Sequence, residues 1–552
     1  MKTNASSTAL PVSTLFYAIS LLAGALATVL LSPKWVVPVM AWVGPGLLLF
    51  YFRHAALRYK ISWFCLVMLV VQMISAYDVA PFPLPVLAIT SVIELLKMLL
   101  IYSVDRAVTK RYSHFITTLV FPAAYVSKEF FDVSYAGGAW WSIANTQYAF
   151  HWLAQLSSVT GLTGISFLIY WFASTVVWIV ERRSKQMPVK LGVAVYAGVF
   201  IAAMLFGISR YTIAATADNK NVPIAGVTVP SFEVLQSIYK DVTGKEVVID
   251  PKISISSPEL QQINAAYVPF IEHPDAARFP NSFRAIAKLH DSLFTLSKKA
   301  ADAGAKIIVW SEGNAVATRA MDNSLIMRGE NFAAGNKVYL LMAMAVFDSG
   351  KIVPATNFLE NKTVFIGPDG KLLNVFHKNH PVPFAEHSTP GDGIVPVINT
   401  PYGKISPSIC YDADIPSGMK QLAQNKTDLL LLPSGDWYAI APYHSYMAIF
   451  RGIENGCTVV RQASGGLSLS TDYRGKTLAQ FDFYGNGEKT WNASIPVGHV
   501  ATVYAQIGDV FPYACIVFVL ATILFIITKA VANFIKGKSA NKKTGDDVLA
   551  ME

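Results

Sequence analysis

The stretch Ile307-Ile-Val-Trp-Ser-Glu312 is a short apolar run that ends in a carboxylate. Such a run predicts a buried β-strand with Glu312 at its end. Two later segments have the same form, Val375-Phe-His-Lys378 and Ile405-Ser-Pro-Ser-Ile-Cys410. Because a rigid sheet holds the side chains at its strand ends in fixed mutual positions while leaving them open to substrate, the three segments predict one site.

A carboxylate, an ammonium group and a thiol are sufficient for acyl transfer through a covalent thioester. Glu312 would take the thiol proton, the Cys410 thiolate would attack a carbonyl carbon, and Lys378 would stabilise the oxyanion. Each residue alone has an ordinary explanation, because strand-end charges are usually solvated and Cys410 could form a disulfide with Cys457. The three residues together favour the catalytic interpretation.

The rest of the chain is unusually apolar. Hydrophobic residues make up 53% of it and charged residues only 15%, which indicates segments buried in lipid. Seven apolar runs about as long as a bilayer crossing precede the strand-like segments, and an eighth follows them; they lie near 14–32, 35–52, 61–77, 81–104, 115–131, 161–180, 190–208 and 510–535. The pattern predicts a membrane domain of seven transmembrane helices over 1–210, a folded domain over 211–508, and an eighth helix with a basic cytoplasmic tail over 509–552.

Lys and Arg concentrate in every second loop between these runs: Arg53, Arg58, Lys60, Arg106, Lys110, Arg111, Arg182, Arg183, Lys185 and Lys190. Because cytoplasmic loops retain Lys and Arg, both termini should lie inside and residues 211–508 outside. The net charge of +9 thus fits a membrane surface. No basic stripe interleaved with aromatic residues points to nucleic acid.

Glu312, Lys378 and Cys410, in that order and with those flanking strands, resemble the nitrilase, or carbon–nitrogen hydrolase, superfamily. Eight spans with such a domain between the seventh and the eighth resemble the apolipoprotein N-acyltransferases of bacterial envelopes. The segments 122–131, 145–148 and 161–167 resemble that family's middle spans. The similarity therefore covers most of the chain.

The resemblance implies a polytopic α-helical membrane domain joined to an α/β nitrilase-like domain, a four-layer α-β-β-α sandwich. It implies a ping-pong reaction in which an acyl chain passes from a phospholipid to Cys410 and then to the N-terminal amine of a diacylglyceryl-cysteine lipoprotein. The enzyme would span the bacterial inner membrane, in contact with membrane lipid, with its catalytic domain in the periplasm.

The resemblance also implies residue roles. Glu312 would be the general base and Lys378 the oxyanion stabiliser, while Glu386 would be a second carboxylate that orients the lysine. Tyr411 and Trp437 match positions that help to shape the pocket. No metal or other cofactor is implied, because chemistry built on Cys and Lys needs none, and no further ligands accompany the nearby histidines, which are His377, His380 and His387.

Four positions depart from the family pattern. Ser311 stands where the family usually has Pro, Asp412 where it has Glu, and Ser434 begins a segment without the expected Asn. The stretch from Gln462 replaces one rich in Asn and Thr. Two alternatives therefore stay open: a membrane-tethered amidase or acyltransferase that acts on another amine or amide, and a catalytically silent envelope protein that binds lipid or a partner.

Three further patterns have two interpretations each. The aromatic stretch 437–450 fits either a pocket wall that meets acyl chains at the membrane or a buried helix. Glu94 and Lys97, on one face of a predicted span, favour an ion pair, or side chains that extend toward the membrane interface, over a transport role. Three segments match glycosylation acceptors, a pattern that is common by chance: Asn361-Lys-Thr, Asn425-Lys-Thr and Asn492-Ala-Ser.

Overall fold

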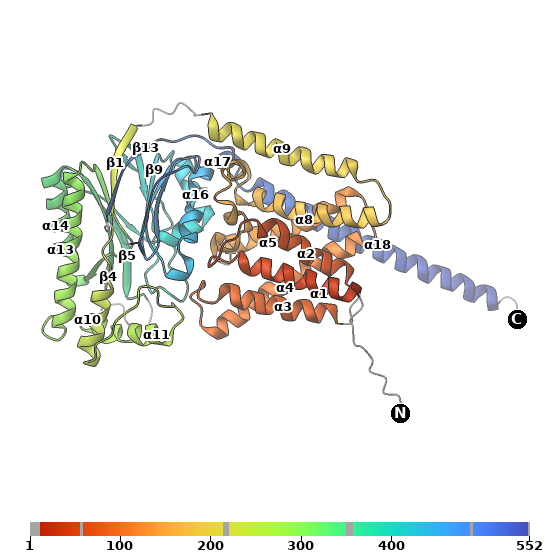
Figure 1. Ribbon diagram of the computed structural model, residues 1–552, viewed down its shortest axis with the longest axis horizontal. Helices are drawn as coiled ribbons and strands as arrows, with labels where there is room; N and C mark the ends of the chain where they lie inside the picture. Colours follow the sequence, from red (N-terminus) through yellow and green to blue (C-terminus); the bar gives the residue numbers. More distant parts are fainter. Residues whose placement is uncertain are drawn as a thin grey trace.

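The computed structural model describes residues 12–55, 59–135, 137–213, 220–348, 357–485 and 490–549. A bundle of helices forms one half of the molecule and a two-sheet α/β domain the other, with the C-terminal helix returning through the bundle (Figure 1). Arg58, residues 1–11 of the predicted membrane domain and residues 550–552 of the predicted tail lie outside the described residues.

The helical half contains α1 (Val12–Leu30), α2 (Met40–His54), α3 (Lys60–Ala76), α4 (Leu84–Thr109), α5 (Val120–Tyr135), α8 (Leu162–Ser184) and α9 (Lys190–Thr212), and α18 (Val510–Leu549) joins it. By length and composition, α4, α8, α9 and residues 510–533 of α18 can each cross a membrane, while α1 and α3 are apolar but shorter. α2 and α5, with 15 and 16 residues, fall short of the roughly 20 residues that a helical crossing needs. The count of eight spans stays a prediction.

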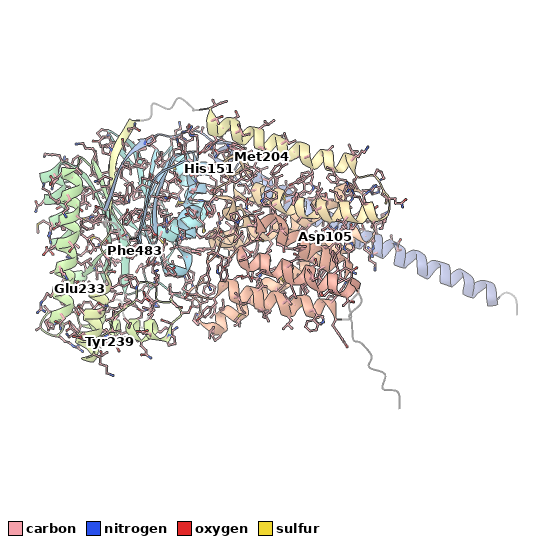
Figure 2. The ribbon with its side chains drawn as sticks, in the orientation of Figure 1. Asp105, His151, Met204, Glu233, Tyr239 and Phe483 are labelled. Carbon is pink, nitrogen blue, oxygen red and sulfur yellow. The ribbon has the colours of Figure 1, made fainter. Side chains whose placement is uncertain are left out.

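The C-terminal ends of α2, α4 and α8, which precede the predicted basic loops, lie together at the end of the bundle away from the α/β domain (Figure 1). There Arg53 of α2 forms a buried ion pair with Asp105 of α4 (Nε to Oδ2, 2.7 Å) and a second one with Glu181 of α8 (3.3 Å). Figure 2 labels Asp105 at this end, while Glu233 and Tyr239 lie on the opposite side of the molecule. The two ends of the bundle are therefore chemically distinct.

Glu94 and Lys97 of α4 form the ion pair that their spacing predicts, at 2.6 Å. Two residues of α5 complete a closed set of four charges: Lys97 lies 2.6 Å from Asp132, and Lys128 lies 2.7 Å from Glu94. Since each charge meets two of opposite sign, the pairing offsets part of their desolvation cost within an apolar bundle.

The α/β domain is built on two sheets. The first has the strand order β13-β1-β2-β4-β5-β6, with β3 on β4, and the second has the order β12-β11-β10-β9-β8-β7. The strands of the first are β1 (Lys220–Val227), β2 (Ile307–Trp310), β3 (Ala315–Thr318), β4 (Tyr339–Phe347), β5 (Leu359–Ile366), β6 (Leu372–His377) and β13 (Thr490–Val497). Those of the second are β7 (Ile398–Thr400), β8 (Gly403–Pro407), β9 (Leu429–Gly435), β10 (Thr458–Ser464), β11 (Leu467–Thr471) and β12 (Thr477–Asp482).

Side chains on the two faces of each sheet pack in different layers of the domain. Ile307 and Val309 of β2 pack between the sheets against Leu429 and Leu431 of β9. The side chains between them point outward, because successive residues of a strand face opposite sides. On one side they meet α13 (Pro280–Asp302) and α14 (Arg319–Asn336), and on the other α15 (Pro416–Gln424) and α16 (Tyr443–Asn455). The predicted four-layer α-β-β-α sandwich is confirmed.

The buried-helix interpretation of the aromatic stretch 437–450 holds for residues 443–450. These residues are the start of α16, a buried helix whose Ile449 and Phe450 pack against Leu153 and Leu162 of the helical half. Tyr438, just before it, is 47% exposed. α16 therefore lies between the second sheet and the bundle, as Figure 1 also shows.

Short elements complete the chain. Those of the bundle are η1 (Phe115–Leu119), η2 (Gly138–Trp141), η3 (Ile143–Gln147), α6 (His151–Ala154) and α7 (Ser157–Thr160). Those of the α/β domain are α10 (Phe232–Thr243), α11 (Pro258–Ala265), α12 (Tyr267–Glu272), η5 (Cys410–Asp414), η6 (Tyr438–Ile440) and α17 (Val503–Ile507). α9 ends and α18 begins close to the predicted domain boundaries.

Candidate active site

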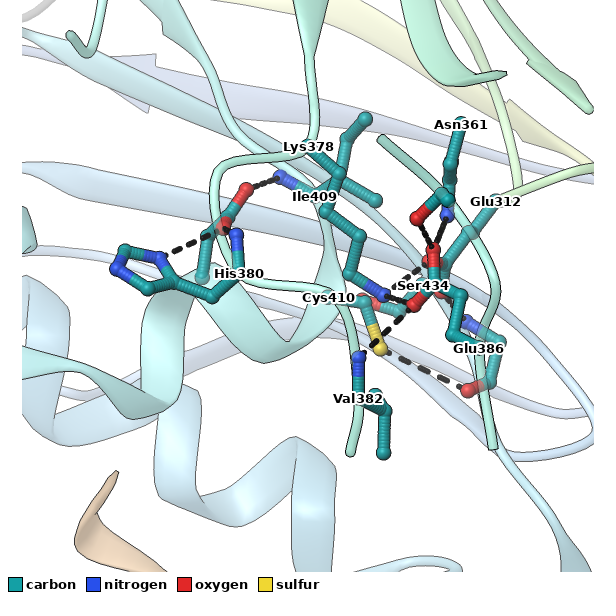
Figure 3. A network of polar contacts seen from close by, with 12 residues as sticks. Glu312, Asn361, Lys378, His380, Val382, Glu386, Ile409, Cys410 and Ser434 are labelled. Carbon is teal, nitrogen blue, oxygen red and sulfur yellow. Dashed lines mark hydrogen bonds and ion pairs between the residues drawn. The ribbon is translucent and has the colours of Figure 1, made fainter. Parts of the chain in front are cut away.

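Glu312 follows β2, and hydrogen-bond donors surround its carboxylate. Its Oε1 accepts hydrogen bonds from Lys378 Nζ (2.8 Å) and Asn361 Nδ2 (2.7 Å), and its Oε2 accepts one from the backbone N–H of Gly435 (2.7 Å). Both oxygens are thus held in place, and the carboxylate is oriented by two strands of one sheet and one of the other (Figure 3).

Lys378 follows β6 and is 1% exposed. Its Nζ lies between Glu312 Oε1 and Glu386 Oε2, at 2.8 Å and 2.5 Å. Burial opposes the ammonium charge, but the two carboxylates outweigh it and raise the pKa of Lys378 well above its usual value. In the same way burial opposes the charge of Glu386, but Lys378 lowers the pKa of that carboxyl. The lysine is therefore a fixed cation.

Cys410 begins η5, just after β8, with a left-handed φ of +46°. This sparsely populated backbone conformation costs about 1–3 kcal/mol and is often found at functional sites. The thiol lies 3.6 Å from the carbonyl oxygen of Gly435. Burial, together with Glu312, raises the pKa of Cys410 well above its usual value. Both effects favour the neutral thiol over the thiolate.

The disulfide alternative is wrong, because Cys65, Cys410, Cys457 and Cys515 are all free. Cys457 is instead a buried residue in the core between the second sheet and α15.

Asp412, one of the departures from the family pattern, supports the backbone on both sides of the site. Its Oδ2 accepts a hydrogen bond from the N–H of Ile409 (3.1 Å), next to Cys410, and its Oδ1 accepts one from the N–H of His380 (2.8 Å), close to Lys378. The shorter carboxylate thus still ties the nucleophile segment to the lysine segment.

The other three departures lie behind the site. Ser311 Oγ contacts Thr228 Oγ at 2.8 Å, Gln462 Oε1 accepts a hydrogen bond from Trp491 Nε1 at 2.7 Å, and the carbonyl of Ser434 accepts one from the N–H of Glu312 at 3.3 Å. All three side chains are buried. They are therefore part of the interior of the α/β domain.

Asn361 of β5 is a site residue that sequence reasoning missed, because its local pattern matches only a glycosylation acceptor. Its Nδ2 donates 2.7 Å hydrogen bonds to both Glu312 Oε1 and Glu386 Oε1. Its carbonyl accepts from the N–H of Lys378, so pairing of β5 with β6 places it there. The side-chain amide of Asn361 therefore bridges the carboxylates of Glu312 and Glu386.

We expect Asn361→Ala to slow the proposed acylation of Cys410 by roughly ten- to a hundredfold, because both carboxylates lose a donor worth about 1–3 kcal/mol. Initial rates of adduct formation, measured by mass spectrometry, check this. Asn492→Ala is the matched control, since Asn492 has the same glycosylation pattern but is exposed on β13. Equal rates in the two variants would remove Asn361 from the site.

Tyr411 and Trp437 both point toward the helical half. The hydroxyl of Tyr411 donates to the carbonyl of Gly137 (2.7 Å), and Trp437 Nε1 donates to the carbonyl of Asp78, in the loop before α4 (2.8 Å). These two residues therefore join the α/β domain to the bundle beside Cys410.

Of the three histidines named from the sequence, His380 contacts the site residues: its Nδ1 lies 3.0 Å from Asp412 Oδ1. His377 lies 3.8 Å from Glu360, and His387 stacks on Phe358. One group of potential metal ligands does exist among the described residues: Cys410, Asp436 and His444. Their donors do not fit a metal ion, because Arg461 binds Asp436 with both of its terminal nitrogens, at 2.9 and 2.8 Å.

Two families match this chain. Residues 276–503 match the carbon-nitrogen hydrolases, and residues 23–175 match the apolipoprotein N-acyltransferase N-terminal domain. An apolipoprotein N-acyltransferase of Geobacter metallireducens is 23% identical over 72% of this chain and 71% of its own. One of Bradyrhizobium diazoefficiens is 25% identical over 69% of this chain and 67% of its own.

Among solved structures, an amidase from Nesterenkonia sp. is similar over 54% of this chain and 95% of its own, with 14% identity and a TM-score of 0.33. The apolar helices and the bacterial relatives indicate a bacterial membrane protein. One matched region lies in the helical bundle and the other in the α/β domain. The chain therefore belongs to the apolipoprotein N-acyltransferase family of the carbon–nitrogen hydrolase superfamily.

Proposed function

We propose that this protein moves an acyl chain from a phospholipid, through a thioester on Cys410, to the N-terminal amine of a diacylglyceryl-cysteine lipoprotein. The observation that carries the proposal is the convergence of the partly buried carboxylate of Glu312 with a buried ammonium group and a buried thiol, where the α/β domain meets the apolar bundle.

In the acylation step, Glu312 takes the thiol proton and the Cys410 thiolate attacks the ester carbonyl carbon of the phospholipid. The negative charge on the carbonyl oxygen develops near Lys378, whose charge is fixed by two carboxylates. Collapse breaks the ester C–O bond, and Glu312 returns the proton to the departing lysophospholipid oxygen. The acyl chain is then a thioester.

In the transfer step, the amine nitrogen attacks the thioester carbonyl and loses a proton to Glu312. The C–S bond breaks, the amide forms, and the sulfur recovers the proton from Glu312. Lys378 serves both steps unchanged because its pKa is raised, so it does not give up its proton.

The test is to mix the purified protein with phospholipid alone and search for an acyl adduct on Cys410 by peptide mapping. A diacylglyceryl-cysteine peptide should then discharge the adduct to an amide. Discharge by water at the same rate would favour a hydrolase, and discharge only by another amine would change the acceptor.

We further propose that the protein lies in the inner membrane with the α/β domain in the periplasm. Support comes from the loops: those rich in Lys and Arg lie at the end that carries Arg53 and Asp105, whereas Asp78 and Gly137 contact the α/β domain.

A reporter fused near residue 350 should therefore be active only outside the cytoplasm, and one fused at Glu552 only inside. Enzymatic and fluorescent topology reporters check this in cells. Activity of both reporters on the same side of the membrane would refute the eight-span arrangement.

A further inference from the structure

A segment of the helical half lies directly over the α/β domain beside Cys410. A Cβ added at Gly138 of η2 would lie only 2.5 Å from the carbonyl oxygen of Asp414, so the two backbones are in close contact. Trp140, two residues later, places its ring 4.8 Å from that of His444 and 6.4 Å from that of Trp437. The bundle therefore covers this part of α16 and η5.

Under Trp140 lies a buried chain of four charges. His444 contacts Asp414 through Nε2 (2.9 Å) and Asp436 through Nδ1 (2.7 Å), and Arg461 pairs with Asp436 through both Nη1 and Nη2 (2.9 and 2.8 Å). The exposed fractions of the four side chains are between 0 and 4%. Charges this deeply buried are stable only when they are paired, so each depends on its neighbours.

His444 is the cation in the middle of the chain. Burial alone would lower the pKa of His444, but Asp414 and Asp436, opposed by Arg461, raise it to about 9. A doubly protonated ring donates from both nitrogens, so the 2.9 Å approach of Arg461 Nη2 to Nδ1 is not a hydrogen bond. With His444 protonated, the positive charges of His444 and Arg461 face the two carboxylates of Asp414 and Asp436.

The chain of charges lies next to the reacting groups: one ring nitrogen of His444 and one carboxylate oxygen of Asp436 are within 4.8 Å of Cys410 Sγ, and the loop that holds Asp436 contacts both groups. Asp436 follows Gly435, whose N–H donates to Glu312 Oε2 (2.7 Å) and whose carbonyl oxygen lies 3.6 Å from Cys410 Sγ. Asp436 itself lies among the groups that act on the Cys410 thiol. A shift of Asp436 would therefore move a contact of the base and a contact of the nucleophile together.

We infer that Trp140 of the helical half and His444 of α16 are positioning residues for Glu312 and Cys410. Trp140 keeps water from His444, and His444 holds Asp436, which fixes the Gly435 loop against the base and the nucleophile. The helical half is then part of the active-site architecture in addition to being an anchor. Of the two readouts described below, acyl-adduct formation rests on the proposed function, and alkylation of Cys410 does not.

The experiment uses the full chain in lipid nanodiscs and compares Trp140→Ala, Trp140→Phe and His444→Gln with the parent. Trp141→Ala is the matched control, because Trp141 is the next residue and is 51% exposed. The first readout is the rate of acyl-adduct formation on Cys410 from phospholipid between pH 6 and 10. The second is the rate of Cys410 alkylation by iodoacetamide, which requires no acyl transfer.

We expect Trp140→Ala to slow adduct formation by roughly tenfold or more, since small displacements of reacting groups cost rate steeply, with Trp140→Phe and Trp141→Ala within about threefold of the parent. In the parent the rate should fall as the pH rises through about 9, where His444 loses its proton. His444→Gln should be slow throughout and lack this alkaline fall. A purely structural role for His444 would lower the rate without changing the shape of the profile.

Alkylation should slow by about threefold or more in His444→Gln at pH 8, because Asp436 loses a balancing cation and thiolate formation becomes less favourable. Equal alkylation and equal adduct formation in the parent, Trp140→Ala and His444→Gln would overturn the inference, as would an alkaline fall retained by His444→Gln. If the parent forms no adduct but alkylation responds as expected, the proposed function fails and the positioning roles stand.

Discussion

Cys410→Ser should form no hydroxylamine-sensitive acyl adduct with phospholipid, although the variant should insert and fold. The reason is the pKa of the nucleophile: a serine hydroxyl is far less acidic than a thiol, and the site already raises the pKa of Cys410. A carboxylate such as Glu312 cannot activate that hydroxyl to a useful degree. Mass spectrometry of the mixture, with peptide mapping around residue 410, measures the adduct.

Cys457→Ser is the matched control. Cys457 is fully buried among apolar residues, and burial raises the pKa of its thiol to about 12. Placing a hydroxyl there should lower the free energy of unfolding by about 1–3 kcal/mol and leave adduct formation nearly unchanged. If instead Cys457→Ser lost the adduct and Cys410→Ser kept it, the nucleophile would be assigned to the wrong cysteine.

Strand ends were the most predictable part of the molecule. The apolar runs before Glu312, Lys378 and Cys410 are local features, and local burial patterns carry enough information to locate buried strands. Their convergence followed from their shared position at strand ends, and the resemblance to a superfamily supported it. The structure adds the distances, above all the position of Lys378 Nζ between Glu312 and Glu386.

Asn361 could not be found in this way, because its role depends on pairing between β5 and β6. The same holds for the charge network, whose members Asp414, Asp436, His444 and Arg461 come from separate elements and meet only after the second sheet and α16 have packed. Helix lengths and ion pairs could not be read from hydropathy either: α5 has 16 residues, and its Lys128 and Asp132 pair with α4.

Glu312→Gln should reduce acylation of Cys410 by roughly a hundredfold or more, because it removes the proton acceptor while keeping the size of the side chain. The structure gives a second reason. All three donors to Glu312 need an oxygen: Lys378 and Asn361 at Oε1, and the Gly435 N–H at Oε2. Whichever way the new amide is turned, its NH2 group faces a donor.

The rate of adduct formation measures this loss, and Glu233→Gln is its control, since Glu233 pairs with Lys288 on the exposed outer face, where its side chain is 57% exposed. The thermal unfolding of Glu312→Gln should also be followed, so that a loss of rate in a folded protein can be separated from a loss of fold. Near-parent acylation in that variant would transfer the role of base to Glu386, the other carboxylate on Lys378. In that case Glu386→Gln should show the hundredfold loss instead, and Glu312 would serve only to orient Lys378 and the Gly435 loop.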